Sequence, residues 1–125
     1  DLISRINEIR KENPALQQTN NVEFYKVDNE HLLFYVKTTE DLSNIILVVV
    51  NLSPYHEHSG WVNVPLEKLG IENDQPYLVH DLLGDEKYIW EGESNFVKLN
   101  PYILPAHIFR VRKKMKKETD FDYFV

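Results

Sequence analysis

The chain has 125 residues, of which 42% are hydrophobic and 27% are charged, a composition typical of one globular domain with its own core. The absence of cysteine excludes disulfide frameworks, thiolate zinc sites and cysteine nucleophiles. The net charge of −6 disfavours non-specific nucleic-acid binding, and the sequence shows neither a signal-peptide pattern nor an apolar run long enough to span a membrane. We therefore expect neither nucleic acid nor a membrane as a partner.

The first residues predict one helix and its end. Apolar residues recur at helical spacing, among them Ile6 and Ile9, with charged residues between them. Because Pro14 disfavours the α conformation of the residue before it, the helix should end near Glu12. Neither a Met nor a capping segment precedes the helix, so we expect the chain to be a part of something longer. A trimmed N-terminus is the plainer alternative.

The chain from residue 17 to residue 112 predicts short strands separated by turns. β-Branched and aromatic residues occur in short runs, and Gly, Pro and Asn-Pro turn signals lie between the runs. Seven or eight such strands predict an all-β fold, an antiparallel β-sandwich that follows the single N-terminal α-helix. The expected strands cover residues 22–27, 31–37, 45–51, 60–64, 77–82, 87–91, 96–99 and 106–112.

Residues 45–50 form the run around which the sandwich is organised. All are apolar and most are β-branched, which predicts a strand buried on both faces. The sandwich core accounts for one face only, and leaving the other face in water would forfeit roughly 1.5–3 kcal/mol per side chain. We therefore expect another structural element to cover Ile46, Val48 and Val50, which share that second face.

Residues 113–125 do not follow the strand pattern. Six of the eight residues 110–117 are Lys or Arg, and a short apolar cluster follows them near the C-terminal end. We expect a frayed tail over residues 113–125, with a docking segment as the alternative.

The histidines predict no catalytic or metal site. His56 and His58 flank Glu57, but two histidines are fewer than the three or four ligands that a zinc site needs. Neighbouring side chains of a strand point to opposite faces, so His80 and Asp81 should not form a catalytic pair. We expect neither a metal nor a cofactor.

Carboxylates occur in pairs at the expected turns, where such groups are normally solvated. Examples are Asp81 with Asp85 and Glu91 with Glu93. Glycoside cleavage would need two carboxyl groups at a fixed separation in a cleft, one of them with a raised pKa.

His107 alternates with apolar residues of an expected strand, so we expect it in the core or at an interface. We therefore expect no catalytic residue in this chain.

Aromatic side chains give the one indication of a binding function. Tyr88 and Trp90 lie two residues apart in an expected strand and therefore share a face, and Trp61 lies in another expected strand. Exposed rings can stack on sugar rings, whereas the alternative is packing in the core or at an interface. We take Trp61, Tyr88 and Trp90 as the candidate sugar-contacting residues.

Five stretches carry a family resemblance over roughly residues 6 to 112 of the chain. They are residues 9–16 (IRKENPAL), 48–52 (VVVNL), 77–85 (YLVHDLLGD), 88–99 (YIWEGESNFVKL) and 105–109 (PAHIF). The first resembles the end of the last barrel helix of α-amylase-superfamily enzymes, the second resembles the Val-rich strand that follows it, and the third resembles the following hairpin. The last two resemble, more narrowly, the C-terminal β-sandwich of the α-1,4-glucan:maltose-1-phosphate maltosyltransferases.

The resemblance implies that this chain is one part of a larger enzyme whose catalytic residues lie in another domain. Residues 1–16 would be the last helix of a catalytic (β/α)8 barrel, and that helix or the barrel would cover the second face of the central strand. Ile46, Val48 and Val50 are therefore the barrel-facing candidates. The parent enzyme would transfer maltosyl units from maltose 1-phosphate to an α-1,4-glucan by a retaining mechanism, with its catalytic carboxylates in the barrel.

The sandwich itself would then be non-catalytic. It would stabilise the barrel of the same polypeptide in a cytoplasmic enzyme, with an α-1,4-glucan or a maltooligosaccharide as a candidate second partner. One alternative is a stand-alone glycan-binding β-sandwich module. Another is the C-terminal domain of an α-amylase, a trehalose synthase or a branching enzyme, because sandwiches of one architecture serve several reactions.

Overall fold

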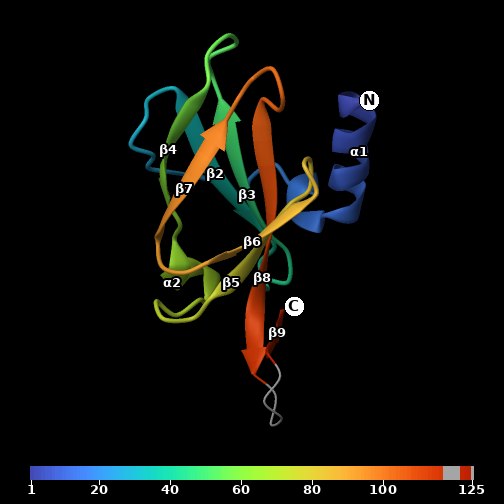
Figure 1. Ribbon diagram of the computed structural model, residues 1–125. Helices are drawn as coiled ribbons and strands as arrows, with labels where there is room; N and C mark the ends of the chain where they lie inside the picture. The colour runs from blue at the N-terminus through green and yellow to red at the C-terminus, as the bar shows by residue number, and fades with distance from the viewer. Residues whose placement is uncertain (117–121, 125) are drawn as a thin grey trace.

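Two antiparallel sheets face each other across the core of this computed structural model, which describes residues 1–116 and 122–124 (Figure 1). The larger sheet has the strand order β1-β2-β3-β8-β5-β6, with β9 paired to β8, and the smaller sheet pairs β4 with β7. The predicted antiparallel sandwich is thus confirmed. The strands are β1 (Val22–Tyr25), β2 (Leu32–Thr38), β3 (Ile45–Asn51), β4 (His58–Asn63), β5 (Tyr77–Asp81), β6 (Glu86–Trp90), β7 (Ser94–Leu99), β8 (Ala106–Lys116) and β9 (Asp122–Phe124).

Helical segments flank the strands. Helix α1 ends at Glu12, as predicted, because Asn13 is extended with a φ of −124°. The expectation of a helix without a cap was wrong, because the carboxylate of Asp1 caps the first turn by accepting a hydrogen bond from the Ser4 backbone N–H at 2.8 Å. The helical segments are α1 (Leu2–Glu12), the 3-10 helix η1 (Pro14–Gln17) and α2 (Leu66–Leu69).

The main core lies between the two sheets and is centred on β3. Ile45, Leu47 and Val49 project into it and are almost fully buried. The one-turn helix α2 adds Leu66 and Leu69 to the same core. This face of β3 is therefore occupied by the interior of the sandwich, as the alternating pattern predicts. The largest other side chains in the core are Phe34, Tyr77, Leu99 and Phe109.

The second face of β3 is covered by the chain itself. Ile46 is 0% exposed and Val48 is 4% exposed, and both pack against Ala15 of η1. Pro14 ends the helix and begins the 3-10 turn, and the small side chain of Ala15 lets that turn lie close to the sheet. The assignment of Ile46 and Val48 as barrel-facing is therefore corrected, because almost none of their surface is left for another domain. Val50 is half-buried and stays a predicted contact.

Two buried asparagines attach the corner between α1 and η1 to the sandwich. Asn44, in the loop before β3, accepts a hydrogen bond from the Ala15 backbone N–H at 3.0 Å. Its side-chain amide donates to Asn13 Oδ1 at 3.0 Å, and Asn13 Nδ2 donates to the Ile9 carbonyl at 2.8 Å. This chain of hydrogen bonds, the asparagine relay, satisfies the backbone groups where the helix ends.

Replacing Asn44 with alanine should lower the free energy of unfolding by roughly 2–4 kcal/mol. The substitution leaves the Ala15 N–H and the Asn13 side-chain oxygen buried without a partner, and each such group costs about 1–3 kcal/mol. Urea unfolding of the 125-residue chain measures the change. The matched control is Asn73→Ala in an exposed loop, where we expect less than about 0.5 kcal/mol. Equal effects of the two substitutions would contradict the relay.

Strand β8 continues past its predicted end at residue 112. Lys113 pairs with Tyr77 of β5, and the following residues of β8 pair with β9. Pairing uses backbone groups, which a basic side chain does not block, so the run of lysines does not end the strand. The described part of the predicted tail is thus a pair of strands. Residues 117–121 and 125 lie outside the described residues, and with them much of the predicted C-terminal apolar cluster.

Candidate functional site

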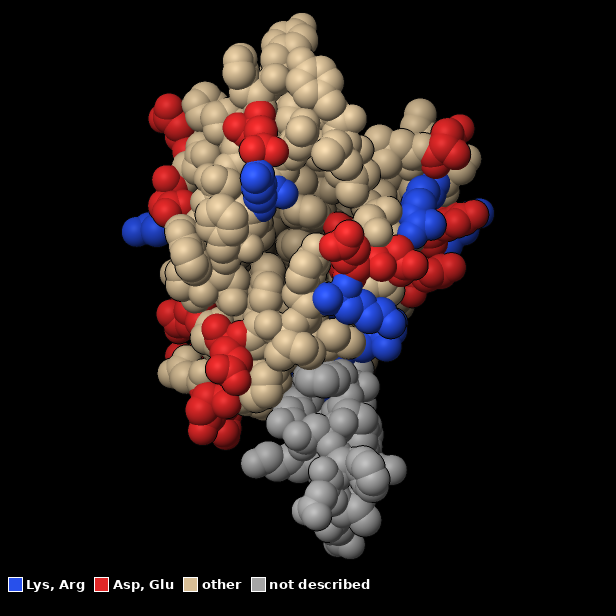
Figure 2. Space-filling model, viewed as in Figure 1, with Lys and Arg blue, Asp and Glu red and all other residues tan. Residues whose placement is uncertain are grey.

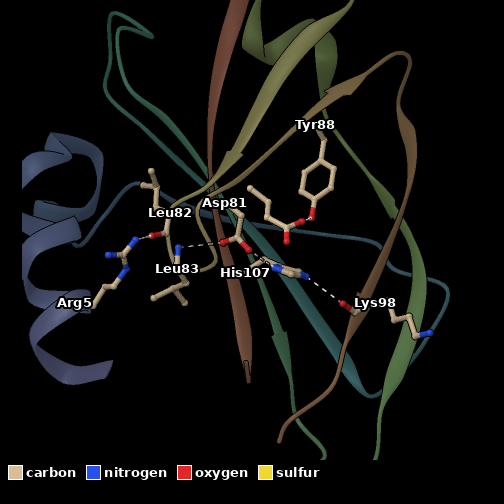
Figure 3. Close-up of polar contacts among 8 residues, drawn as sticks. Arg5, Asp81, Leu82, Leu83, Tyr88, Lys98 and His107 are labelled. Atoms are coloured by element: carbon tan, nitrogen blue, oxygen red, sulfur yellow. Dashed lines mark hydrogen bonds and ion pairs between the residues drawn. The ribbon is translucent and has the colours of Figure 1, made fainter. Parts of the chain in front are cut away.

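A buried Asp–His pair joins the two sheets beside their open edge. Asp81 ends β5 and has a side chain that is 3% exposed, and its Oδ2 lies 2.8 Å from Nδ1 of His107 on β8. The other ring nitrogen, Nε2, lies 3.1 Å from the Lys98 carbonyl on β7, so each nitrogen faces an oxygen acceptor (Figure 3). Asp81 Oδ1 also accepts from the Leu83 backbone N–H at 3.2 Å. The pair therefore links the large sheet to the small one.

The Asp–His pair has the partners of a structural contact rather than of a catalytic site. His107 meets a carboxylate and a carbonyl, neither of which is a nucleophile activated by loss of a proton. His80 points away from Asp81, as predicted, and lies 2.9 Å from Asp85. That hydrogen bond lowers the pKa of the Asp85 carboxyl. The expected core or interface role of His107 is confirmed.

A groove runs between β6 and β7 beside this pair. One part has a volume of about 220 Å³ and is lined by Tyr88, Trp90, Phe96, His107 and Phe109, with Val97 and Lys98. A second part of about 320 Å³ shares Tyr88, Lys98 and His107 with the first. The two hollows therefore adjoin at these side chains, and together we call them the aromatic groove.

The two aromatic residues of β6 take different roles in the aromatic groove. They share a face, as predicted. Trp90 packs edge-on against Phe109 at 5.3 Å between ring centroids and against Tyr77 at 6.3 Å, which ties it to the core. Tyr88 is 39% exposed and meets Phe109 at 6.4 Å. The structure thus gives Trp90 the packing role and leaves much of the Tyr88 ring accessible.

Trp61 lies on the outer face of the small sheet, next to a residue that the sequence interpretation missed. Trp61 and Phe96 are cross-strand partners of β4 and β7, each 50% exposed, with ring centroids 5.5 Å apart and planes at 64°. Phe96 also lines the groove, so it connects Trp61 to the rings of β6. The sequence signal was its place in a predicted strand, and the structure buries its neighbours Asn95 and Val97, which places its ring on the outer face.

The phenol of Tyr88 has a perturbed pKa. Burial of the ring is the larger cause, and the hydrogen bond from its hydroxyl to Glu86 Oε2, at 2.8 Å, adds to it. Together they raise the pKa of Tyr88 to about 12 from the usual 10.0. The neutral phenol is the form that donates to the carboxylate, so both causes act in the same direction.

An alkaline titration should show this shift directly. The ultraviolet absorbance of Tyr88→Phe is subtracted from that of the wild-type chain at each pH. We expect the phenolate absorbance in this difference to rise with a midpoint near pH 12. Glu86→Gln should move that midpoint down, because it removes the carboxylate. The unfolded chain releases this proton near its usual pKa, so the contribution of the phenol to stability is present below pH 10.0 and is lost as pH rises through about 12. A midpoint near 10 would contradict the geometry.

The remaining histidines do not gather into a metal site. His58 Nδ1 lies 3.2 Å from Asn29 Nδ2, and its ring stacks on His31 at 4.2 Å. Loss of water contact and then repulsion from His31 and His56 lower the pKa of His58. Within residues 1–116 and 122–124, no group of three or more His, Asp or Glu side chains is placed to hold a metal ion. In the same part of the chain, no helix is long and apolar enough to cross a membrane.

Comparison with known sequences finds one family and close relatives. Residues 24–111 match the family described as "GLGE, C-terminal". The chain is 44% identical over 115 residues to the α-1,4-glucan:maltose-1-phosphate maltosyltransferase of Chlorobaculum tepidum, covering 87% of this chain and 17% of that protein. It is 37% identical over 124 residues to the protein of the same name in Myxococcus xanthus, covering 99% of this chain and 18% of that protein. The chain therefore spans about a sixth of the length of these relatives.

Comparison with solved structures finds α-amylases. An α-amylase of Anoxybacillus has a TM-score of 0.63 at 14% identity, over 94% of this chain and 23% of that one. The α-amylase of Geobacillus thermoleovorans, complexed with acarbose, has a TM-score of 0.63 at 12% identity, over 90% of this chain and 22% of that one. At such identities the likeness shows the fold alone. The family match, which covers most of the sandwich, shows more: the chain belongs to the GLGE C-terminal family.

Proposed function

We propose that this chain is the non-catalytic C-terminal domain of a glycosyltransferase that moves maltosyl units from maltose 1-phosphate to an α-1,4-glucan. The observation that carries the proposal is the family match over residues 24–111, together with relatives whose names state this activity. The chain covers only 17–18% of those relatives, so the reaction is assigned to a (β/α)8 barrel of the same polypeptide.

The carboxyl groups of the aromatic groove support a role without catalysis. A retaining transfer needs a nucleophilic carboxylate and a carboxylic acid about 5–5.5 Å apart, on either side of the reacting carbon. Here the buried Asp81 is held by His107, Glu86 is held by Tyr88, and Glu57 lies 3.5 Å from Lys98 Nζ. These carboxyls fix the structure of the groove, which agrees with chemistry that takes place in another domain.

Helix α1 offers a surface through which the sandwich would contact the barrel. Its inner side is fixed by the asparagine relay and by Arg5 Nη2, which donates to the Leu82 carbonyl at 2.9 Å (Figure 3). Apolar side chains in its first turns remain exposed, and exposed apolar surface of this kind marks interaction sites. We propose that the barrel covers these residues, which are Leu2, Ile3 and Ile6.

The proposal is tested by comparing the full-length protein with the 125-residue chain. Supplied with maltose 1-phosphate and maltohexaose, the full-length protein should release phosphate and lengthen the acceptor by one maltosyl unit. The short chain should release none. Phosphate release by the short chain would contradict its non-catalytic role. Hydrolysis of α-glucan by the full-length protein, without use of maltose 1-phosphate, would favour the α-amylase alternative.

We also propose that the parent enzyme acts in the cytoplasm. The donor carries a charged phosphate group, and charged groups cross the apolar interior of a membrane only at a high cost in free energy. Donor and enzyme should therefore share the compartment in which the donor is made. Cell fractionation followed by immunoblotting tests this, and recovery of the protein outside the cytoplasmic fraction would contradict it.

A further inference from the structure

The aromatic groove carries a set of side chains that the proposed function does not use. Rings of Tyr88, Trp90 and Phe96 line it, and Trp61 extends the same aromatic surface beyond Phe96. We propose that this groove binds a chain of α-1,4-linked glucose units. The position of the site and its affinity for sugar follow from its geometry, whereas the choice of α-1,4-linked glucose rests on the proposed function.

The exposed rings supply the apolar part of such a site. A pyranose ring has faces formed by C–H groups, and these faces stack on aromatic rings while the hydroxyls at the ring edge point outward. Trp61 and Phe96, whose planes differ by 64°, therefore offer ring surfaces in two directions at the outer rim of the groove. Tyr88 offers a third across the groove, on β6. Successive glucose units of a curved glucan chain could stack on aromatic rings set at such angles.

The rim supplies hydrogen-bonding groups of both charges. Lys98 Nζ lies 3.5 Å from Glu57 Oε1, and both side chains are about half exposed. Glu86 uses one carboxylate oxygen for Tyr88, and a carboxylate has about four acceptor positions, so it can accept further hydroxyl groups. Opposite charges at one rim suit a neutral ligand that both donates and accepts hydrogen bonds. An anionic ligand would meet Glu57 and Glu86, and it is disfavoured for that reason.

The size and position of the groove also fit a bound oligosaccharide. Its two adjoining parts have volumes of about 220 and 320 Å³, and the larger reaches the lower end of the range of about 300–1,000 Å³ that is typical of small-molecule sites. Helix α1, which we propose contacts the barrel, lies on the far side of the large sheet from Tyr88 and Lys98 (Figure 3). Figure 2 shows that charged groups are scattered over the face with β4, β6 and β7, with broad uncharged areas between them.

The test measures glucan binding by the full-length protein with affinity electrophoresis in gels that contain glycogen. Trp61→Ala and Phe96→Ala each remove a half-exposed ring and leave the core intact, and each should raise the dissociation constant for glycogen about tenfold. Tyr55→Ala is the matched control, because Tyr55 is equally exposed or more so and does not line the groove. It should leave the dissociation constant unchanged. The melting temperature of each variant shows whether it is folded.

The outcomes separate this inference from the proposed function, because the gel assay requires no maltose 1-phosphate. Glycogen binding that is equal in the wild type, Trp61→Ala and Phe96→Ala would overturn the groove as a glucan site, whatever the result of the transferase assay. Weaker binding in those two variants, with Tyr55→Ala unchanged, supports the site even if the full-length protein transfers no maltosyl units. Equal retardation by dextran, which is α-1,6-linked, would overturn the choice of an α-1,4 linkage.

Discussion

Replacing His107 with alanine is expected to lower the free energy of unfolding by about 3–5 kcal/mol. The Asp81 side chain is 3% exposed, so the substitution leaves a carboxylate that is buried and has lost its partner at 2.8 Å. Breaking a buried polar pair from one side costs this much because the Asp81 side chain is left without water and with only the Leu83 backbone N–H as a hydrogen-bond donor. It also removes the hydrogen bond to the Lys98 carbonyl, which joins β8 to β7. Urea unfolding of the 125-residue chain measures the loss.

The chain provides a matched control for this prediction. His80 and Asp85 also lie 2.9 Å apart, but the Asp85 side chain is 74% exposed. Alanine at His80 should therefore cost far less than alanine at His107, because water can solvate the carboxylate that remains. The double variant Asp81→Ala, His107→Ala should be more stable than the sum of its two single effects predicts. Strict additivity would contradict a direct interaction between the two side chains.

Ile46→Ala should lower the free energy of unfolding by about 2–5 kcal/mol in the 125-residue chain itself. Ile46 is 0% exposed beneath Ala15 and Leu16, so the truncation leaves a cavity between the sheet and the η1 segment. If the barrel were the cover of this face, the isolated chain would leave Ile46 in water, and the substitution would cost little.

Ile89→Ala is the control for the second prediction. Ile89 is also an isoleucine within a strand, but it is largely exposed. Its truncation removes little buried surface, so we expect a change within about 0.5 kcal/mol. Similar effects at Ile46 and Ile89 would show that the second face of β3 is not covered within this chain. They would restore the barrel as the expected cover.

Features that depend on neighbours in the chain were predictable from the sequence. The end of α1 follows from Pro14, which acts on the residue directly before it. The burial of β3 on both faces follows from its unbroken apolar run, and the common face of Tyr88 and Trp90 follows from their spacing of two. The family was recognisable too, because short motifs carry it. The strand pair β8–β9 was missed, because lysines were interpreted as a solvated tail although pairing depends on the backbone.

Features that depend on how the sheets assemble were not predictable. The aromatic groove brings Phe96 of β7 and Tyr88 of β6 into one lining, and these strands belong to different sheets. The contact between Asp81 and His107 joins residues 26 positions apart, and no local pattern marks such a pair. Tyr88 and Trp90 line this groove and Trp61 packs against Phe96, while Phe96 itself was not among the residues predicted from the sequence.

The sequence by itself determined the family, the single N-terminal helix, the sandwich and its central strand, because periodicity, turn residues and short motifs act over a few positions. Only the tertiary structure decided what covers Ile46 and Val48. Their cover is a turn whose Ala15 N–H bonds to Asn44, 29 positions away. Such contacts form when segments distant in the sequence pack together. Their free energy depends on how well the side chains of the two segments fit each other, which is defined only in the folded chain.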